Sequence, residues 1–315
     1  MKDLKIVFMG TPDFAVGVLQ YLVENNQNIV AVITAPDRPA GRGRKLQGSA
    51  VKQYAVAQEI PVLQPTNLKN DDFITHLKSF EADLQIVVAF RMLPKVVWQL
   101  PAYGTFNLHA SLLPQYRGAA PINWALIHGE PKTGVTTFFI DEKIDTGEII
   151  FKEEVPISKR ETAGTLHDTL MRVGSKLVLK TVHAIADGTA TTQEQPKTKT
   201  AKEAPKLTPE NTKIDWSQTA AQIDALVRGL SPYPVAWCYL NQQEEQLKVK
   251  IYKTTVEPAI PTEAPGTICA TKKTIKVACI NGYLFIEELQ LPGKRKMDAA
   301  SLLNGFTFGE DAMLT

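Results

Sequence analysis

Short apolar runs alternate with segments of helical periodicity along the first 190 residues, and this alternation limits the chain to very few folds. The runs are LKIVFM, NIVAVIT, LQIVVAF, TFNLHA and GVTTFFI, and the segments between them include DFAVGVLQYL and SAVKQYAVAQE. Such an order predicts parallel strands joined by crossover helices. A long helical pattern over 162–188 closes the series. We therefore expect an α/β, Rossmann-like open and mostly parallel sheet with flanking helices.

The composition of the chain changes after residue 189. Residues 190–208 are rich in Thr, Lys and Pro and lack apolar periodicity, which is typical of a linker. Beyond it, one amphipathic segment, SQTAAQIDALVRGL, precedes several β-like runs separated by Gly, Asn and Pro. The sequence thus predicts an α/β domain over 1–189, a linker over 190–208, and a smaller, mostly-β, OB-like barrel over 209–315.

Composition argues against several classes of protein. The chain has 315 residues, 44% of them hydrophobic, a formal net charge of +2, and three cysteines without a CxxC pair. An odd number of widely spaced cysteines argues against a disulfide framework, and no apolar run is long enough to span a bilayer. We expect a cytoplasmic, monomeric protein without membrane contact, in which any nucleic-acid site is a local basic patch.

The first glycines lie where an α/β protein can bind a dinucleotide. The segment GTPDFAVG has only Gly10 and Gly17, however, and lacks the G-x-G-x-x-G spacing of a pyrophosphate site. We predict a tight turn in which Thr11 caps the following helix, Pro12 lies in its first turn and Asp13 favours the positive end of the helix dipole. A nicotinamide oxidoreductase is therefore disfavoured.

The stretch FNLHASLLPQYRG, residues 106–118, carries the strongest signal of chemistry. Residues i and i+2 of a strand face the same side, so Asn107 and His109 project together near the carboxyl end of a strand. An acidic loop, FIDEKIDTGEI, follows the next predicted strand and offers Asp145 as partner of the imidazole, although Asp141 could play the same part. An amide donor, a histidine and a carboxylate supply the oxyanion stabilisation and proton transfer that acyl transfer to an amine needs.

The loop APDRPAGRGRKLQG gathers Arg38, Arg42, Arg44 and Lys45 among Gly and Pro. Such basic loops are often only solvated surface. Guanidinium groups on a flexible arm also suit contacts to phosphates and bases, so this loop is the candidate basic patch. No cluster of His, Cys, Asp or Glu has the spacing of metal ligands, and we expect no catalytic metal.

Together these segments resemble the folate-dependent formyltransferase family. The similarity lies in NLHASLLPQYRGAAPINWALIHGE, the DTG at 145–147, the opening GTPDF and the loop PDRPAGRGRKL, and the linker and β domain extend it over essentially the whole chain. In this family, Asn-x-His followed by a distant Asp is the catalytic signature. The resemblance therefore implies Asn107, His109 and Asp145 as the catalytic residues, and it selects Asp145 over Asp141.

The resemblance also implies a formyl donor, 10-formyltetrahydrofolate. Its crevice would be formed by Ser111, Leu112, Leu113, Pro114, Phe90, Met92, Ile140 and Asp141. One departure falls in this crevice. Relatives usually read Ala-Tyr-Gly-x-Ile-Leu-Pro there, whereas this chain reads Ala-Phe-Arg-Met-Leu-Pro over 89–94, one residue shorter and without glycine.

The opening GTPDF, the basic loop and the second domain resemble the branch of the family that formylates initiator methionyl-tRNA for translation initiation. In that branch the loop enters the acceptor stem, which implies tRNA contacts by Arg38, Arg42, Arg44 and Lys45, with Arg42 foremost, and a tRNA-binding C-terminal domain. The alternatives are a formyltransferase acting on a small amine, such as glycinamide ribonucleotide or an amino sugar nucleotide, and a non-catalytic RNA-binding protein.

Overall fold

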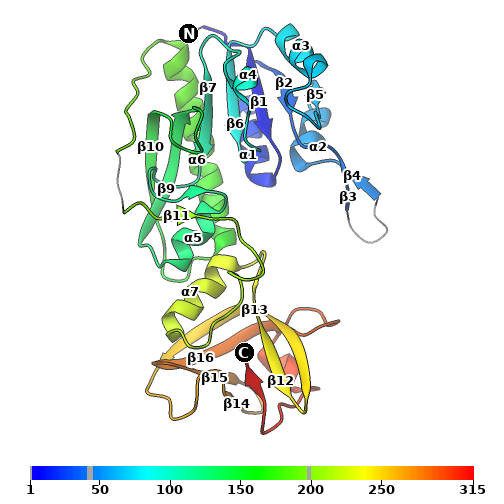
Figure 1. Ribbon diagram of the computed structural model, residues 1–315, viewed down its shortest axis with the longest axis vertical. Coiled ribbons are helices and arrows are strands. Elements are labelled where there is room, and N and C mark those ends of the chain that lie inside the picture. The colour runs from blue at the N-terminus through cyan, green and yellow to red at the C-terminus, as the bar shows by residue number, and fades with distance from the viewer. Residues whose placement is uncertain (1, 41–44, 197–199) are drawn as a thin grey trace. The chain divides into compact units, whose positions relative to one another are not determined.

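The chain folds into two compact units in the computed structural model, which describes residues 2–40, 45–196 and 200–315 (Figure 1). The first unit comprises Met1–Pro121, Thr133–Pro156 and His167–Glu203. The second comprises Ile122–Lys132, Ile157–Leu166 and Ala204–Thr315. The predicted division into an α/β domain over 1–189, a linker over 190–208 and a barrel over 209–315 stays a prediction.

A seven-stranded sheet forms the centre of the first unit. Its spatial order is β10 (Ile149–Pro156), β9 (Lys132–Phe139), β7 (Thr105–His109), β6 (Leu84–Val88), β1 (Ile6–Gly10), β2 (Ile29–Ile33) and β5 (Val62–Leu63). The pairs from β7 to β5 are parallel, and β9 runs antiparallel to β7. Every residue of β1 and β6 is buried, as expected for strands covered on both faces. The expected Rossmann-like architecture is confirmed.

Helices flank this sheet (Figure 1). They are α1 (Asp13–Glu24), α2 (Ala50–Ala57), α3 (Asp71–Ser79), α4 (Lys95–Trp98) and most of α6 (Ala163–Ala186). Two small sheets pair β3 (Arg38–Ala40) with β4 (Lys45–Gln47), and β8 (Arg117–Gly118) with β11 (Glu203–Ala204). The side chains of Ser49 and Asn70 cap α2 and α3 by accepting backbone N–H groups.

The predicted start of α1 was wrong in one detail. Its N-cap residue is Pro12, not Thr11, and no side chain caps the helix. The Pro12 carbonyl instead accepts the N–H of Ala15 at 2.9 Å. Gly10 permits this tight strand-to-helix turn, because a Cβ there would lie 2.5 Å from the Ala15 Cβ.

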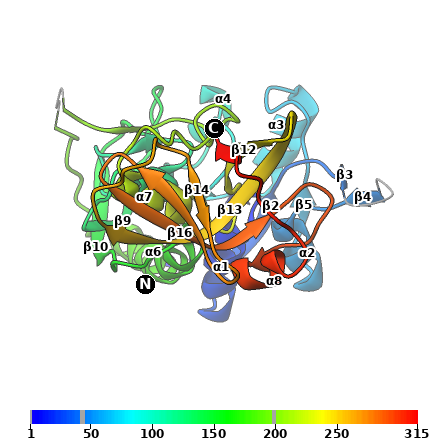
Figure 2. The ribbon, with the colours of Figure 1, turned by 90° about the horizontal axis from the view of Figure 1, so that it is seen from below.

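A strongly bent antiparallel sheet forms the second unit, and Figure 2 looks onto it. Its order is β14 (Ile268–Ala270), β15 (Ile275–Cys279), β16 (Gly282–Gln290), β13 (Glu245–Pro258), β12 (Ala236–Gln242) and β18 (Met313–Leu314), with β17 (Met297–Asp298) paired to β16. The helices of this unit are α5 (Pro121–Ile127), α7 (Ala220–Leu230) and α8 (Ala299–Leu303). Inward residues of the strands pack with α7 around one apolar core, which confirms the predicted β-barrel.

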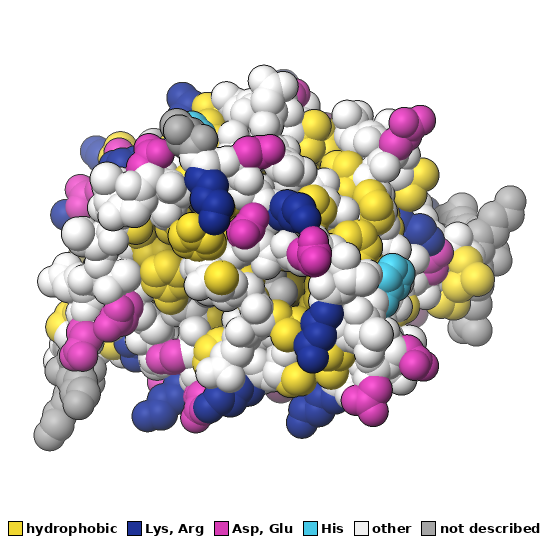
Figure 3. Space-filling view, turned by 90° about the horizontal axis from the view of Figure 1, so that it is seen from above, with side chains coloured by type: hydrophobic (Ala, Val, Ile, Leu, Met, Phe, Trp, Pro, Cys, Tyr) yellow, Lys and Arg dark blue, Asp and Glu magenta, His cyan; other side chains and the backbone are white. Residues whose placement is uncertain are grey.

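The surface carries both signs of charge. On the face shown in Figure 3, Lys and Arg side chains lie among Asp and Glu side chains. This mixture agrees with the net charge of +2. Within the described part of the chain, none of the helices has the length and apolar character needed to cross a membrane.

Candidate active site

Strand β7 carries the two polar residues that the sequence singles out. Its Leu108 packs against α6, where a Cβ on Gly174 would lie 2.8 Å from the Leu108 side chain. Alternation along the strand therefore places Asn107 and His109 on the opposite face of the sheet. On that face Asn107 lines a cavity of about 300 Å³, which Asp145 also lines.

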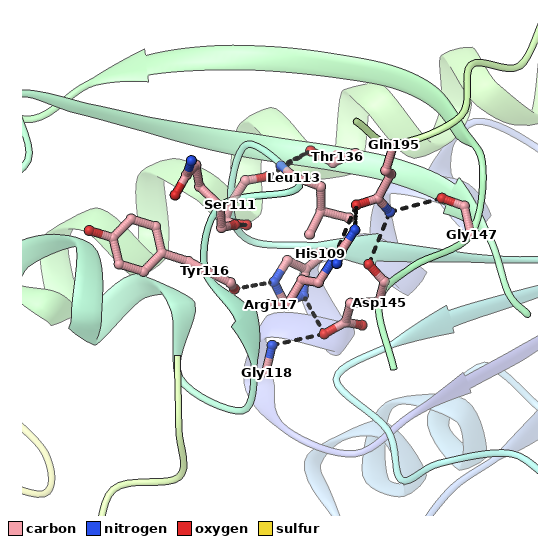
Figure 4. A network of polar contacts seen from close by, with 11 residues as sticks. His109, Ser111, Leu113, Tyr116, Arg117, Gly118, Thr136, Asp145, Gly147 and Gln195 are labelled. Carbon is pink, nitrogen blue, oxygen red and sulfur yellow. Dashed lines mark hydrogen bonds and ion pairs between the residues drawn. The ribbon is translucent and has the colours of Figure 1, made fainter. Parts of the chain in front are cut away.

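His109 is hydrogen-bonded at one ring nitrogen and faces a carboxylate with the other (Figure 4). Its Nε2 lies 2.8 Å from the Tyr116 carbonyl oxygen, and its Nδ1 lies 3.8 Å from Asp145 Oδ2. A carbonyl oxygen can only accept a hydrogen bond, so Nε2 carries the proton of the neutral ring. The nitrogen left to accept a proton is then Nδ1, which faces the carboxylate.

Asp145 is positioned by its backbone and by a neighbouring turn. Its Oδ2 also accepts the backbone N–H of Gly118 at 2.9 Å. The residue adopts φ +54°, in the left-handed region, which turns its side chain toward His109. Asp141 serves the same loop differently, because its Oδ1 accepts the N–H of Lys143 at 2.9 Å and the hydroxyl of Thr146 at 2.8 Å. The structure thus brings Asp145, and not Asp141, next to the imidazole.

Four of the predicted folate contacts line the cavity. They are Phe90, Met92, Ile140 and Asp141, and they are joined there by Val87, Arg91, Leu93, Phe138, Lys143 and Ile144. The lining combines apolar side chains with a few polar groups, which is typical of a small-molecule site.

The segment that departs from the family pattern forms one edge of this cavity. Ala89 adopts φ +47°, and the Arg91 guanidinium donates to the carbonyl oxygens of Pro65 and Thr66. Met92 is 65% exposed. The shortened segment is therefore tied to the chain beyond β5 by its own arginine.

The other four predicted folate contacts, Ser111, Leu112, Leu113 and Pro114, are not part of this cavity lining. Leu113 is buried against Phe138 and Ile149. Thr136 Oγ1 accepts the N–H of Leu113 at 3.2 Å and donates to the Ser111 carbonyl at 2.7 Å. These contacts brace the turn after β7, and contact of this segment with folate stays a prediction.

A lysine from the neighbouring edge strand reinforces the same turn. The Lys152 ammonium, from β10, donates to the Leu113 carbonyl. Burial lowers the pKa of Lys152. The turn that carries Tyr116 toward His109 is thus fixed by contacts from β9 and from β10.

Several residues of the polar network were not singled out by the sequence analysis. Among them are Tyr116, Arg117, Gly118 and Gln195 (Figure 4). The first three belong to the QYRG turn at 115–118, so this turn was the feature of the sequence that could have indicated them. Gln195 lies in the segment predicted to be a linker, where nothing in the composition marks it.

The predicted basic loop is a short antiparallel hairpin at its described ends. Arg38 is exposed and pairs across the hairpin with Gln47, while the backbone of Lys45 pairs with Ala40. Arg42 and Arg44 lie outside the described residues. The hairpin is anchored at Asp37, whose pKa is lowered by a hydrogen bond from Gln64 and by the Lys52 ammonium 2.6 Å away.

No site for a metal is formed within the described ranges. Residues 2–40, 45–196 and 200–315 include no group of three or more His, Cys, Asp or Glu side chains placed to hold an ion.

Comparison with known proteins agrees with this geometry. Residues 4–182 match the model of the Formyl transferase family, and residues 206–307 match that of the Formyl transferase C-terminal domain. The structure is similar to that of WlaRD, a sugar 3N-formyl transferase, with 21% identity and a TM-score of 0.64 over 94% of this chain and 100% of that chain. It is also similar to HypX from Aquifex aeolicus in complex with tetrahydrofolic acid, with 17% identity and a TM-score of 0.65 over 96% of this chain and 47% of that one.

Curated relatives are much more similar and extend over the full length. The methionyl-tRNA formyltransferase of Flavobacterium psychrophilum is 55% identical over 100% of both chains, and that of Flavobacterium johnsoniae is 54% identical over 99% of both. The enzyme of the same name from Bacteroides fragilis is 51% identical over 98% of this chain and 97% of its own. The chain therefore belongs to the formyl transferase family, in the group of the methionyl-tRNA formyltransferases.

Proposed function

We propose that the protein transfers the formyl group of 10-formyltetrahydrofolate to the free amino group of initiator methionyl-tRNA, acting in the cytoplasm. The observation that carries this proposal is His109 Nδ1 facing Asp145 Oδ2 at 3.8 Å, beside a cavity lined by Asn107. The names of the relatives that match the full chain support the same substrates.

The residues suggest a direct transfer. The amine attacks the formyl carbon, and the Nδ1 of neutral His109 takes the proton that the amine loses, so that Asp145 stabilises the imidazolium that forms. The oxyanion of the resulting tetrahedral intermediate is stabilised by the Asn107 amide and by this imidazolium. The C–N10 bond then breaks, the proton passes to the leaving nitrogen, and tetrahydrofolate departs. No covalent enzyme intermediate is required.

The cavity suits the donor. Phe90, Phe138 and Ile140 offer apolar surface to a flat heterocycle, and Asp141 offers a carboxylate at the edge. A cavity of about 300 Å³ is at the lower end of the range for small-molecule sites, so we assign it to the pterin part of the donor. The adjoining Ser111 to Pro114 turn would contact the donor only after a shift of its side chains.

Two features suit a tRNA acceptor. The basic loop contains Arg38, Arg42, Arg44 and Lys45 in its sequence, and Arg38 is exposed on the hairpin. On the second unit, the Lys248 ammonium lies 3.8 Å from the centre of the Trp237 ring. Cationic side chains beside aromatic rings are a common surface for nucleic acid, which supports a tRNA-binding role for the barrel.

The decisive experiment is a substrate comparison. Purified protein and 10-formyltetrahydrofolate are incubated with methionine-charged initiator tRNA, with glycinamide ribonucleotide, or with an amino sugar nucleotide, and the formylated product is measured. We expect formylmethionine on the tRNA and no comparable product from the small amines. Faster formylation of a small amine would contradict the proposal and favour a formyltransferase that acts on small amines.

Two variants test the mechanism in the same assay. Asn107→Ala is expected to lower kcat by about a hundredfold or more, and His109→Ala by at least as much. Thermal unfolding serves as the control for folding. Near-normal turnover in either folded variant would show that the catalytic assignment is wrong. A protein that only binds RNA would keep its RNA binding in both variants.

A further inference from the structure

The chain that follows α6 returns to the loop between β9 and β10. The backbone of Gln193 exchanges hydrogen bonds with that of Ile149, at 2.8 and 2.9 Å. Thr192 adds a hydroxyl bond to Glu148. Gln195 is half-buried there, whereas its described neighbours over 191–196 are exposed. Part of the predicted linker therefore packs on the catalytic loop.

The side-chain amide of Gln195 makes four hydrogen bonds (Figure 4). Its Nε2 donates to the Asp145 carbonyl at 2.9 Å and to the Gly147 carbonyl at 2.8 Å. Its Oε1 accepts from Arg117 Nε at 3.2 Å and from Nη2 at 2.6 Å. Carbonyl oxygens only accept and a guanidinium only donates, so these partners fix the orientation of the amide.

These hydrogen bonds stabilise the part of the loop whose backbone conformation is least favourable. Asp145 has φ +54°, a conformation that costs free energy for a residue with a side chain. Two residues later, a Cβ on Gly147 would lie 1.7 Å from the Phe139 carbonyl oxygen, so this backbone lies directly against β9. The Gln195 amide bridges the carbonyls on both sides of Thr146 and so fixes the turn between them.

Gln195 also connects the two segments that surround the His109 and Asp145 pair. Arg117 lies between Tyr116, whose carbonyl meets His109 Nε2, and Gly118, whose N–H binds the Asp145 carboxylate. Through Arg117 and the Asp145 loop, one amide therefore contacts both sides of the pair.

We propose that Gln195 is a positioning residue for the formyl transfer, which holds the Asp145 carboxylate opposite His109 and makes the segment after α6 part of the active site. The inference rests on the proposed function, because it concerns the role assigned to Asp145. Gln195 itself contacts no reacting atom in this proposal and acts only through Asp145 and Arg117.

Three variants test the role. Gln195→Glu keeps the acceptor for Arg117 and removes both donors to the loop. Gln195→Met removes all four hydrogen bonds with a side chain of similar length. Gln193→Ala is the matched control, because the described bonds of Gln193 to Ile149 are made by its backbone. We expect kcat to fall about 10- to 100-fold in both Gln195 variants and less than about twofold in the control. The KM for the formyl donor is expected to stay close to that of the native enzyme.

A double-mutant cycle separates positioning from a general loss of structure. In an Asp145→Asn background, Gln195→Glu is expected to cost less than about twofold in kcat, since the charge that it positions is already absent. An equal loss in both backgrounds, or an unchanged kcat in folded Gln195→Glu, would overturn the inference. If Gln195→Met unfolds, the Glu variant decides alone. A weak effect of Asp145→Asn itself would instead refute the proposed mechanism. Failure of the Gln195 inference and failure of the proposed function therefore give different results.

Discussion

Replacing Asp145 by Asn isolates the charge that faces His109. The two side chains are 15% and 7% exposed, and Asp145 Oδ2 lies 3.8 Å from His109 Nδ1. Asn has the same shape, and its carbonyl oxygen can still accept the N–H of Gly118. The variant therefore removes the stabilisation of the imidazolium while it leaves the packing of the loop in place.

The expected loss follows from this distance. Two unit charges about 4 Å apart interact by about 4 kcal/mol at an effective dielectric constant of about 20. Partial exposure of Asp145 and the salt in the buffer reduce this value, and we take about 2 kcal/mol as the lower bound. At about 1.4 kcal/mol for each factor of ten, kcat is expected to fall by about 30- to 1000-fold.

Single-turnover formylation of charged initiator tRNA at saturating donor measures this loss directly. Asp141→Asn is the matched comparison, because it removes a carboxylate from the same loop that bonds Lys143 and Thr146 and does not face His109. We expect that variant to change the KM for the donor more than the rate at saturation. An Asp145→Asn rate within about fivefold of native, or a slower rate in Asp141→Asn, would refute the reasoning.

Three further predictions concern the rest of the chain. If the hairpin contacts tRNA phosphates, Arg42→Ala is expected to weaken productive tRNA use and to make its salt dependence shallower, with folate binding unchanged; native tRNA kinetics and selectivity would assign the loop to solvated surface. Limited proteolysis is expected to cut first within 190–208 and to release two folded pieces, the N-terminal one still binding folate; first cleavage before residue 189 would contradict the proposed boundary. Burial raises the pKa of Cys238 to about 12 and that of Cys279 to about 11. The pKa of Cys269 is also raised, but its side chain is only half-buried, so at pH 8 a thiol reagent is expected to label Cys269 first; rapid labelling of all three in the native protein would contradict the burial of Cys238 and Cys279.

The sheet could be predicted from the sequence because each of its central strands is recognised from its own apolar run, without knowing which strands it pairs with. A run such as LQIVV, buried at all five positions of β6, is apolar because both faces of a parallel sheet are covered. The hairpin of β3 and β4 gave no such signal, since each strand has three residues and they carry proline and charge. Its pairing depends on the chain around it rather than on an apolar pattern.

The catalytic signature could be found in the sequence, but its support could not. Asn107 and His109 are two apart on one strand, so local geometry places them together. The contacts of Gln195 reach Asp145 and Arg117, which lie 50 and 78 positions away in the sequence. Spacing also left Asp141 and Asp145 equivalent; the resemblance to the family selected Asp145, and the conformation of the loop places that residue opposite His109.

Backbone strain marks the same region of the molecule. Among the described residues with side chains and positive φ, Asn26, Glu59 and Glu81 follow the ends of helices, where this conformation commonly terminates a helix. Ala89, Val235, Gln243 and Glu244 lie in turns or loops elsewhere. Tyr116 and Asp145, with φ +60° and +54°, follow no helix and flank His109. Each costs about 1 kcal/mol relative to an ordinary conformation, and hydrogen bonds from the surrounding chain must offset that cost. Tyr116 places its carbonyl at Nε2 of His109, and Asp145 places its carboxylate opposite Nδ1. The strained backbone therefore lies where it determines which ring nitrogen carries the proton and which one faces the negative charge.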